Sequence, residues 1–162
     1  MADLRPTTPL PTSGTTPIRV RYCECDPMGV AHHAAFVPWL EIARTELLRV
    51  GGVTYKQLEA ASVFLVVASL DIKYRRPGRY DDLLEVSCRV SGGSRVKLEH
   101  DYEVRVIERV GDDPERLRAS GDDLLATART TLVCVGANMA VRALPDWLAA
   151  PATPAPAPPQ PR

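Results

Sequence analysis

The sequence predicts an α+β domain in which one antiparallel β-sheet wraps around one long α-helix. Apolar residues recur at helical spacing in a single long segment near residue 40. After residue 63, the long apolar patterns mostly have the two-residue period of a strand with one buried face. Such a sheet needs a cover for its apolar face, and the amphipathic helix is the element that can provide it.

The first predicted elements are a strand and a turn. Residues 18–22 alternate apolar and charged side chains, which predicts a half-buried strand. Asp26–Gly29 has the composition of a turn, because Pro27 restricts the backbone and Gly29 can adopt a positive φ. The sequence therefore predicts a constrained loop just before the long helix.

The long helix follows this turn. From Phe36, apolar residues recur at i, i+4, i+7 and i+11, which predicts a helix of about four turns that ends at Gly51-Gly52. Pro38 fits only in a first turn, so the helix should begin near Ala35 or Phe36. Thr54 can cap a second short helix that runs to Ala61.

The remaining segments are predicted to be strands joined by turns. Residues 63–70 are nearly all apolar, as in a strand buried on both faces, and an alternating end follows them. The predicted elements are strands at 63–75, 84–90, 96–106 and 124–135, a hairpin turn at Gly92-Gly93, a polar loop at 109–123, and a short turn of helix at 144–148.

The prolines divide the chain into a central domain and two tails. The 162 residues include 15 prolines, of which four lie in residues 1–17 and six in residues 151–162. Segments of this composition bury too little apolar surface to offset the entropy of the chain. Residues 1–17 and 151–162 are therefore predicted to be disordered tails, and residues 18–150 one domain.

The charge balance and the hydropathy exclude some classes of protein. The 20 Lys and Arg residues match the 20 Asp and Glu residues, whereas a nucleic-acid-binding protein usually has a basic excess. No segment approaches the roughly 20 apolar residues of a transmembrane helix, and the N-terminus has no signal-peptide pattern. We therefore expect a cytoplasmic protein without nucleic-acid or membrane partners, whose four cysteines are reduced.

The segment that can carry out chemistry is the turn before the long helix. It places the Asp26 carboxylate between a strand and a helix N-terminus, where free amides and the helix dipole stabilise negative charge. A carbonyl group held there would be polarised as its oxyanion develops. Asp26 would then either attack the carbonyl carbon or deprotonate a water molecule.

The same segment resembles a known enzyme family. The pattern Asp26-x-x-Gly29-x-x-x-His33, followed by Phe36 and by Glu41-x-Ala43-Arg44, is similar to the signature of hot-dog-fold acyl-CoA thioesterases of the 4-hydroxybenzoyl-CoA thioesterase and YbgC type. The resemblance extends from about residue 18 to residue 148. It implies a hot-dog fold, an acyl-CoA substrate and a homodimer or homotetramer with active sites at the interface between subunits that share a continuous sheet. It also implies that Asp26 is catalytic and that no cofactor is needed besides the coenzyme A of the substrate.

Two departures from the family pattern bear on the substrate. His32 stands where many relatives have Tyr, and Cys25 stands where a Thr is common. The acyl group is not specified: Phe36, Trp39, Phe64 and Tyr74 can line a pocket or pack in the core. Since fold does not establish reaction, a hydratase or dehydratase acting on a thioester and a non-catalytic acyl-CoA-binding module are the alternative functions.

The candidate catalytic residues each have a structural alternative. Asp26 can be an Asx-turn residue, and His33 can be a buried structural histidine. Glu41 shares a helix face with apolar residues and needs a partner, which favours a structural hydrogen bond over water activation. The residues predicted for catalysis are Asp26, Gly29 and His33, and those predicted for the oxyanion and substrate are His32, Ala34, Ala35, Phe36 and Glu41, with the backbone amides of 32–35 as oxyanion donors.

A basic cluster is the candidate site for the phosphates of coenzyme A. Four positive charges fall within seven residues, and arginine forks suit phosphate groups, although such clusters also form solvated rims. The predicted residues are Lys73, Arg75, Arg76 and Arg79, with Arg95 and Lys97 as a second pair. No metal site is predicted, because Cys23 and Cys25 with two neighbouring histidines lack the usual zinc spacing.

Overall fold

The computed structural model describes residues 5–149, which form one five-stranded sheet and a set of helices. The strands are β1 (Ser13–Arg19), β2 (Phe64–Tyr74), β3 (Leu83–Gly93), β4 (Lys97–Glu108) and β5 (Leu124–Val135). The helices are α1 (Phe36–Val50), α2 (Tyr55–Ala60) and α3 (Pro114–Ser120), with short 3-10 helices η1 (Tyr22–Glu24) and η2 (His33–Ala35).

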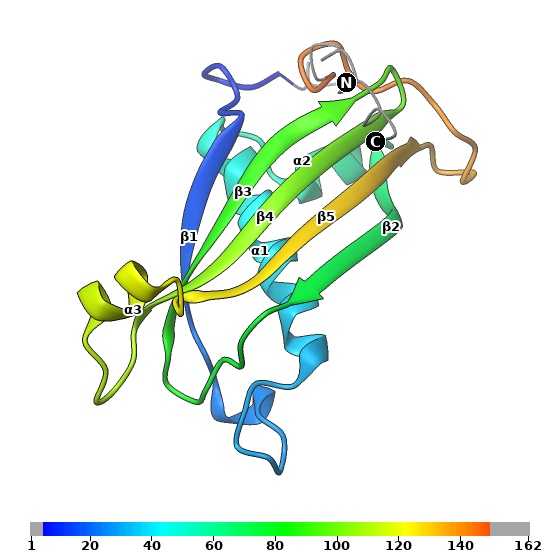
Figure 1. Cartoon of the computed structure of the whole chain (residues 1–162). Coiled ribbons are helices and arrows are strands. Elements are labelled where there is room, and N and C mark those ends of the chain that lie inside the picture. Colours follow the sequence, from blue (N-terminus) through cyan, green and yellow to red (C-terminus); the bar gives the residue numbers. More distant parts are fainter. Residues whose placement is uncertain (1–4, 150–162) are drawn as a thin grey trace, which may run out of the picture.

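The sheet is antiparallel throughout and wraps around α1. Its strand order is β1-β3-β4-β5-β2, so β1 and β2 form its two edges. Figure 1 shows α1 running along one face of the sheet, while none of the described helices covers the other face. The predicted hot-dog architecture is therefore confirmed. None of the helices in the described part of the chain is long and apolar enough to cross a bilayer.

Helix α1 forms the centre of the core, as its periodicity predicts. It begins at Phe36 with Pro38 in its first turn and is followed by Gly51 as its C-cap. Its inner face packs against β3, β4 and β5, and burying this apolar stripe is the main source of its stability. The buried residues of this face are Phe36, Trp39, Leu40, Ala43 and Leu47.

The smaller predicted elements are partly confirmed. The Thr54 side chain accepts a hydrogen bond from the Gln57 amide and caps α2. Strand β5 has the predicted bounds. The turn placed at Gly92-Gly93 lies slightly later, at residues 94–96, and Gly92 instead follows a register shift at the end of β3.

The predicted boundary of the N-terminal tail is wrong for residues 13–17. These residues belong to β1 and pair with β3, from Ser13 opposite Arg89 to Arg19 opposite Leu83. Pro17 is tolerated because β1 is an edge strand, where a missing N–H group costs no ladder hydrogen bond. Before β1, the Thr7 amide donates to the main-chain oxygen of Gly51. The predicted C-terminal tail at 151–162 lies outside the described residues.

Two other expectations are corrected. The apolar run at 63–70 predicts burial on both faces, but β2 is an edge strand on which Val67 remains 51% exposed and Leu70 38% exposed. The predicted polar loop contains α3, which Asp113 caps at its N-terminus and Gly121 ends with a φ of +72°. Asp-Pro at the start and Gly at the end are helix boundary signals, but the short segment lacks a strong apolar period.

Candidate active site

Asp26 lies at the tip of a small hairpin that leads into α1. The Asp26 amide donates to the Val30 oxygen at 2.9 Å, and the His32 amide donates to the Glu24 oxygen at 2.8 Å. The Gly29 amide closes the turn on the Asp26 oxygen, and its φ of +76° favours glycine at this position. We call residues 24–32 the Asp26 hairpin.

Only one oxygen of the Asp26 carboxylate accepts a hydrogen bond within this hairpin. Oδ1 accepts the Met28 amide at 2.9 Å, which is the Asx-turn contact of the structural alternative. Oδ2 accepts no hydrogen bond from the described residues. The Asx-turn role and a chemical role are therefore compatible, since one oxygen holds the turn and the other remains available.

One of the four backbone amides at residues 32–35 is available within the described part of the chain. Three of the four amides predicted as oxyanion donors already have protein acceptors: His32 donates to Glu24, Ala34 donates to His32 Nδ1 at 3.2 Å, and Ala35 donates to the His32 oxygen at 2.9 Å. The His33 amide opens η2 and, within residues 5–149, donates no hydrogen bond. The predicted set of donors is thereby reduced to His33.

An open cavity of about 280 Å³ has His33 among its lining residues. It brings together residues that the sequence assigned to different parts of the site, His33 and Phe36 from the helix start and Arg75 and Arg76 from the basic cluster. Tyr74 forms another wall, and its hydroxyl donates to the His33 oxygen at 3.0 Å. The remaining lining residues are Ala31 and Pro77.

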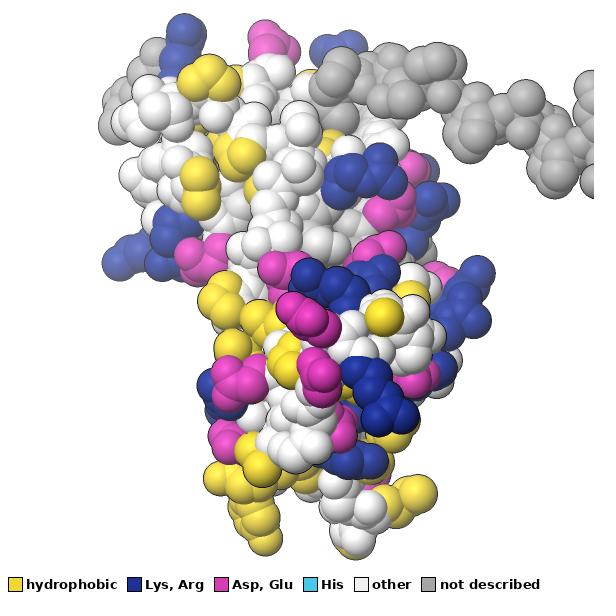
Figure 2. Space-filling view, turned by 60° about the vertical axis from the view of Figure 1, so that its left-hand side comes forward, with side chains coloured by type: hydrophobic (Ala, Val, Ile, Leu, Met, Phe, Trp, Pro, Cys, Tyr) yellow, Lys and Arg dark blue, Asp and Glu magenta, His cyan; other side chains and the backbone are white. Residues whose placement is uncertain are grey.

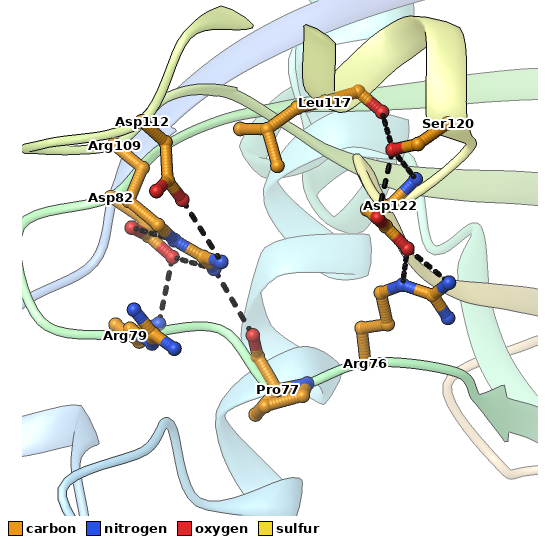
Figure 3. Close-up of polar contacts among 9 residues, drawn as sticks. All are labelled: Arg76, Pro77, Arg79, Asp82, Arg109, Asp112, Leu117, Ser120 and Asp122. Carbon is orange, nitrogen blue, oxygen red and sulfur yellow. Dashed lines mark hydrogen bonds and ion pairs between the residues drawn. The ribbon is translucent and has the colours of Figure 1, made fainter.

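The loop after β2 is held in place by two ion pairs, which Figure 3 shows side by side. Arg76 Nε donates to Asp122 Oδ1 at 2.6 Å, and this pair is about half exposed. Asp82 is buried and receives both Arg109 Nε at 2.9 Å and Arg109 Nη2 at 2.6 Å. The hydrogen bond to Asp82 raises the pKa of Arg109, although burial opposes this. The loop is therefore held by a buried ion pair between Asp82 and Arg109 and by a solvent-accessible ion pair between Arg76 and Asp122.

The loop is also joined to the Asp26 hairpin. The Ala31 amide donates to the Gly78 oxygen at 2.9 Å, and Val30 forms an isolated bridge with Arg79. The Tyr22 and Tyr80 rings meet edge to face, with centroids 5.6 Å apart. Figure 2 shows exposed apolar side chains gathered at the lower end of the molecule, the end at which the Asp26 hairpin lies in Figure 1.

The other predicted basic residues do not join this cavity. Lys73 lines a broad polar hollow across the outer face of the sheet, together with Asp71 and Arg129. Arg95 and Lys97 lie at the β3–β4 turn, at the opposite end of the sheet from the Asp26 hairpin in Figure 1. Arg95 and Lys97, the second candidate pair for the phosphates, are therefore separated from Arg75 and Arg76 by the length of the strands within one chain, and their binding role stays a prediction.

Glu41 has the partner that its position requires. Its carboxylate accepts Arg44 Nη2 at 3.1 Å, which confirms the predicted structural contact. The Glu41 side chain is 62% exposed, however, so this helix face is not the buried face that the sequence suggested. Arg44 is buried and lies over the Tyr55 ring. Glu41 lies further along α1 than the helix start and does not line the cavity.

Glu24 is a buried carboxylate to which the sequence assigned no role. Its Oε1 accepts the indole Nε1 of Trp39 at 3.0 Å and Arg21 Nη2 at 2.6 Å, and its Oε2 accepts the Arg21 amide at 2.8 Å. Burial acts to raise the pKa of Glu24, but the hydrogen bonds from Arg21 and Trp39 outweigh it and lower that pKa. The only sequence feature that could have pointed to Glu24 is its position between two cysteines just before the turn, which is weak evidence for a role.

A metal site requires several side chains that can bind one metal ion. Within residues 5–149, no group of three or more His, Cys, Asp or Glu side chains is arranged to hold a metal ion. The adjacent His32 and His33 rings stack with centroids 4.0 Å apart, and Cys23 and Cys25 are free thiols.

Comparison with known proteins identifies the family. Residues 20–158 match the model of the thioesterase-like superfamily. The chain belongs to this superfamily. Its membership confirms the resemblance found in the motif. The acyl-CoA thioester hydrolases among its relatives confirm the prediction of a thioester hydrolase.

Similar proteins include one named hydrolase and two solved structures with the same fold. An acyl-CoA thioester hydrolase, YbgC of Escherichia coli, is 32% identical over 83% of this chain and 91% of its own length. A hypothetical protein of Thermus thermophilus, TT1821, superposes with a TM-score of 0.68 at 33% identity, over 83% of this chain and 90% of that one. The 4-hydroxybenzoyl-CoA thioesterase of Pseudomonas sp. strain CBS-3 shares the fold, with a TM-score of 0.71 at 18% identity, over 85% and 98% of the two chains.

Proposed function

We propose that this protein hydrolyses an acyl-CoA thioester, of an aromatic or a short- to medium-chain acid, to a carboxylate and free coenzyme A. The observation that carries the proposal is the unpaired His33 amide, which opens η2 beside a cavity bordered by two arginines. The names of the curated relatives support the substrate class, since they include acyl-CoA thioester hydrolases. The reaction needs no cofactor besides the coenzyme A that belongs to the substrate.

In this proposal the His33 amide binds the thioester oxygen. A donor at a helix N-terminus stabilises the negative charge that develops on this oxygen in the transition state. The edge of the Phe36 ring and Tyr74 enclose the acyl group on the other side of the cavity. His33 is one of the residues that line the cavity. In this proposal its side chain orients the substrate, while its main chain supplies the hydrogen bond.

Asp26 supplies the attacking group through its available Oδ2. As general base, it takes a proton from water while the hydroxide adds to the carbonyl carbon; the C–S bond then breaks and the thiolate takes the proton from Asp26. As nucleophile, it forms an anhydride and releases the thiolate, and water then hydrolyses the anhydride. Gly29 allows either route by keeping the tight turn that presents the carboxylate.

Arg75 and Arg76 are the proposed contacts for the phosphates of coenzyme A, with Arg79 on the same loop. Guanidinium groups bind phosphate through paired, charge-assisted hydrogen bonds. Arg76 can exchange Asp122 for a phosphate oxygen because its ion pair is about half exposed, and exposed pairs contribute little to stability.

We further propose that two chains pair through β2 and complete each other's sites. This edge strand leaves Val67, Leu70 and Tyr74 exposed, and an open edge can accept a second strand. Pairing β2 with its symmetry mate extends the sheet and covers the apolar side chains near the cavity. Light scattering coupled to gel filtration should give at least twice the 17.7 kDa of one chain, and a monomer would contradict this.

The test of the function is a thiol-release assay over aromatic, short and long acyl-CoAs. We expect turnover with at least one class, and an Asp26→Asn variant that folds normally but loses at least about 100-fold in kcat. Absence of thiol release with every class would contradict hydrolysis. Near-normal turnover of Asp26→Asn would contradict the mechanism but not the reaction.

A further inference from the structure

We propose that Glu24 is a positioning residue that sets the separation between the Asp26 carboxylate and the His33 amide. Glu24 does not touch the substrate in this proposal, and its effect passes through the two groups that do. The inference rests on the proposed function, because it assigns Glu24 a role in the chemistry of Asp26. It concerns a side chain that the thioesterase mechanism itself does not use.

The first observation is that the Glu24 carboxylate joins two segments, η1 with its cap and α1. It accepts the indole N–H of Trp39, which is fully buried in the first turn of α1. It also accepts both the amide and the guanidinium of Arg21, at the entry to η1. All donors converge on a side chain that is 7% exposed, so the carboxylate is held with little solvent screening.

The second observation is that the main chain of Glu24 closes the base of the Asp26 hairpin. Its oxygen accepts the His32 amide at 2.8 Å, and two positions further on the Asp26 amide donates to Val30. Asp26 and His33 therefore leave the same hairpin from opposite strands, and Glu24 pairs with the residue directly before His33. Moving this pair moves the carboxylate relative to the amide.

The third observation is that Trp39 is held both by packing and by a polar contact to Glu24. Trp39 already packs against Phe36, with ring centroids 4.7 Å apart. The Glu24 carboxylate also fixes the orientation of Trp39 relative to η1, because the Trp39 indole N–H and the Arg21 amide N–H each bind one of its oxygens. Directional constraint is what a reaction between two separately held groups requires, since a displacement of about 1 Å can cost about 100-fold in rate.

The decisive variant is Glu24→Gln. A neutral amide has the shape of the carboxylate, but it presents one N–H₂ group where Glu24 has an acceptor, so either Arg21 or Trp39 must face a donor. We expect kcat to fall by about 10- to 100-fold, while KM and the affinity for a non-hydrolysable thioether analogue of acyl-CoA change by less than about threefold. Trp39→Phe removes the indole N–H but keeps most of the packing and the Arg21 contacts with Glu24, so we expect a smaller loss of kcat. This variant replaces Glu24→Gln in the test if Glu24→Gln folds poorly.

A matched control separates positioning from general stability. Tyr102→Phe removes a buried hydrogen bond to Thr130, which lies within the sheet away from the hairpin. We expect it to lower the melting temperature with kcat unchanged. If Tyr102→Phe lowers kcat as much as Glu24→Gln at a similar loss of melting temperature, the effect of Glu24 is one of stability and the proposal is overturned.

A double variant distinguishes this proposal from the proposed function. If Glu24 acts through Asp26, then Glu24→Gln added to Asp26→Asn lowers kcat no further, because no positioned carboxylate remains to be displaced. Independent, multiplying losses would overturn the role of Glu24 while leaving Asp26 catalytic. Normal kcat in Glu24→Gln with a large loss in Asp26→Asn would likewise overturn the role of Glu24 alone, whereas full activity of Asp26→Asn contradicts the proposed mechanism itself.

Discussion

The Tyr74 hydroxyl donates a hydrogen bond of 3.0 Å to the main-chain oxygen of His33 and so joins the end of β2 to the start of α1. The Phe36 ring meets Tyr74 edge to face, with centroids 5.1 Å apart. These two contacts link three of the residues that line the cavity, His33, Phe36 and Tyr74. An edge strand thereby supports a helix N-terminus that it does not otherwise cover.

Tyr74→Phe tests this support. We expect kcat for the best acyl-CoA to fall by roughly 3- to 10-fold, because one hydrogen bond at the helix start is lost while the ring remains. The free energy of unfolding should change little, since the Tyr74 side chain is about half exposed. Tyr80→Phe is the matched control: the Tyr80 hydroxyl makes no hydrogen bond to the described residues, so kcat should be unchanged. Equal effects of the two variants would contradict the support.

Arg75→Ala tests the contact with the phosphates. We expect KM for acyl-CoA to rise by roughly 10-fold, because a charge-assisted hydrogen bond to phosphate is lost. The matched substrate is an acyl thioester of N-acetylcysteamine, which has no phosphate, and its KM should not change. An unchanged KM for acyl-CoA would remove Arg75 from the binding site.

Asp82→Asn tests the buried anchor of the loop after β2. Removing one charge of a buried pair leaves the Arg109 guanidinium with the more distant Asp112, at 3.9 Å, as its remaining carboxylate among the described residues. We therefore expect the free energy of unfolding to fall by about 3 kcal/mol. Arg89→Ala, which breaks the exposed pair with Asp101, should cost at most about 1 kcal/mol. Urea denaturation of both variants measures the difference, and a similar small loss in both would show that the Asp82 pair does not hold the loop.

His100 should make stability depend on pH. Burial and the nearby Arg44 lower the pKa of His100 to about 4 from its ordinary value of 6.5. The unfolded chain therefore binds a proton that the folded chain does not, so the free energy of unfolding falls as the pH drops from about 6.5 to about 4, by up to about 3 kcal/mol. Comparing His100→Leu with the parent chain by urea denaturation at pH 7 and pH 4.5 isolates this contribution. The same decrease in both proteins would assign the acid sensitivity to other groups.

The elements that the sequence predicts well are those whose signals are local. The apolar period from Phe36 and the position of Pro38 define where α1 begins, and the capping threonine defines α2. By contrast, the apolar run of β2 predicts burial on both faces, whereas its edge position leaves Val67 exposed. The period of a strand does not encode its place in the sheet, because that place depends on partners distant in sequence.

The hot-dog fold, the thioesterase-like family and the Asp26 turn before α1 can all be recognised in the order of the amino acids. The turn before α1 and a sheet wrapped around one helix follow from residues close together along the chain, whose spacing controls backbone conformation and face. The family and its hot-dog fold follow instead from the resemblance of the motif. Three features emerge only when the chain is folded: the unpaired amide at the helix start, the separation of Arg95 from Arg75 at opposite ends of the sheet, and the contact of Glu24 with Trp39. These are relations across the core, where the acceptor for a given donor depends on the packing of α1 against the sheet rather than on neighbouring residues.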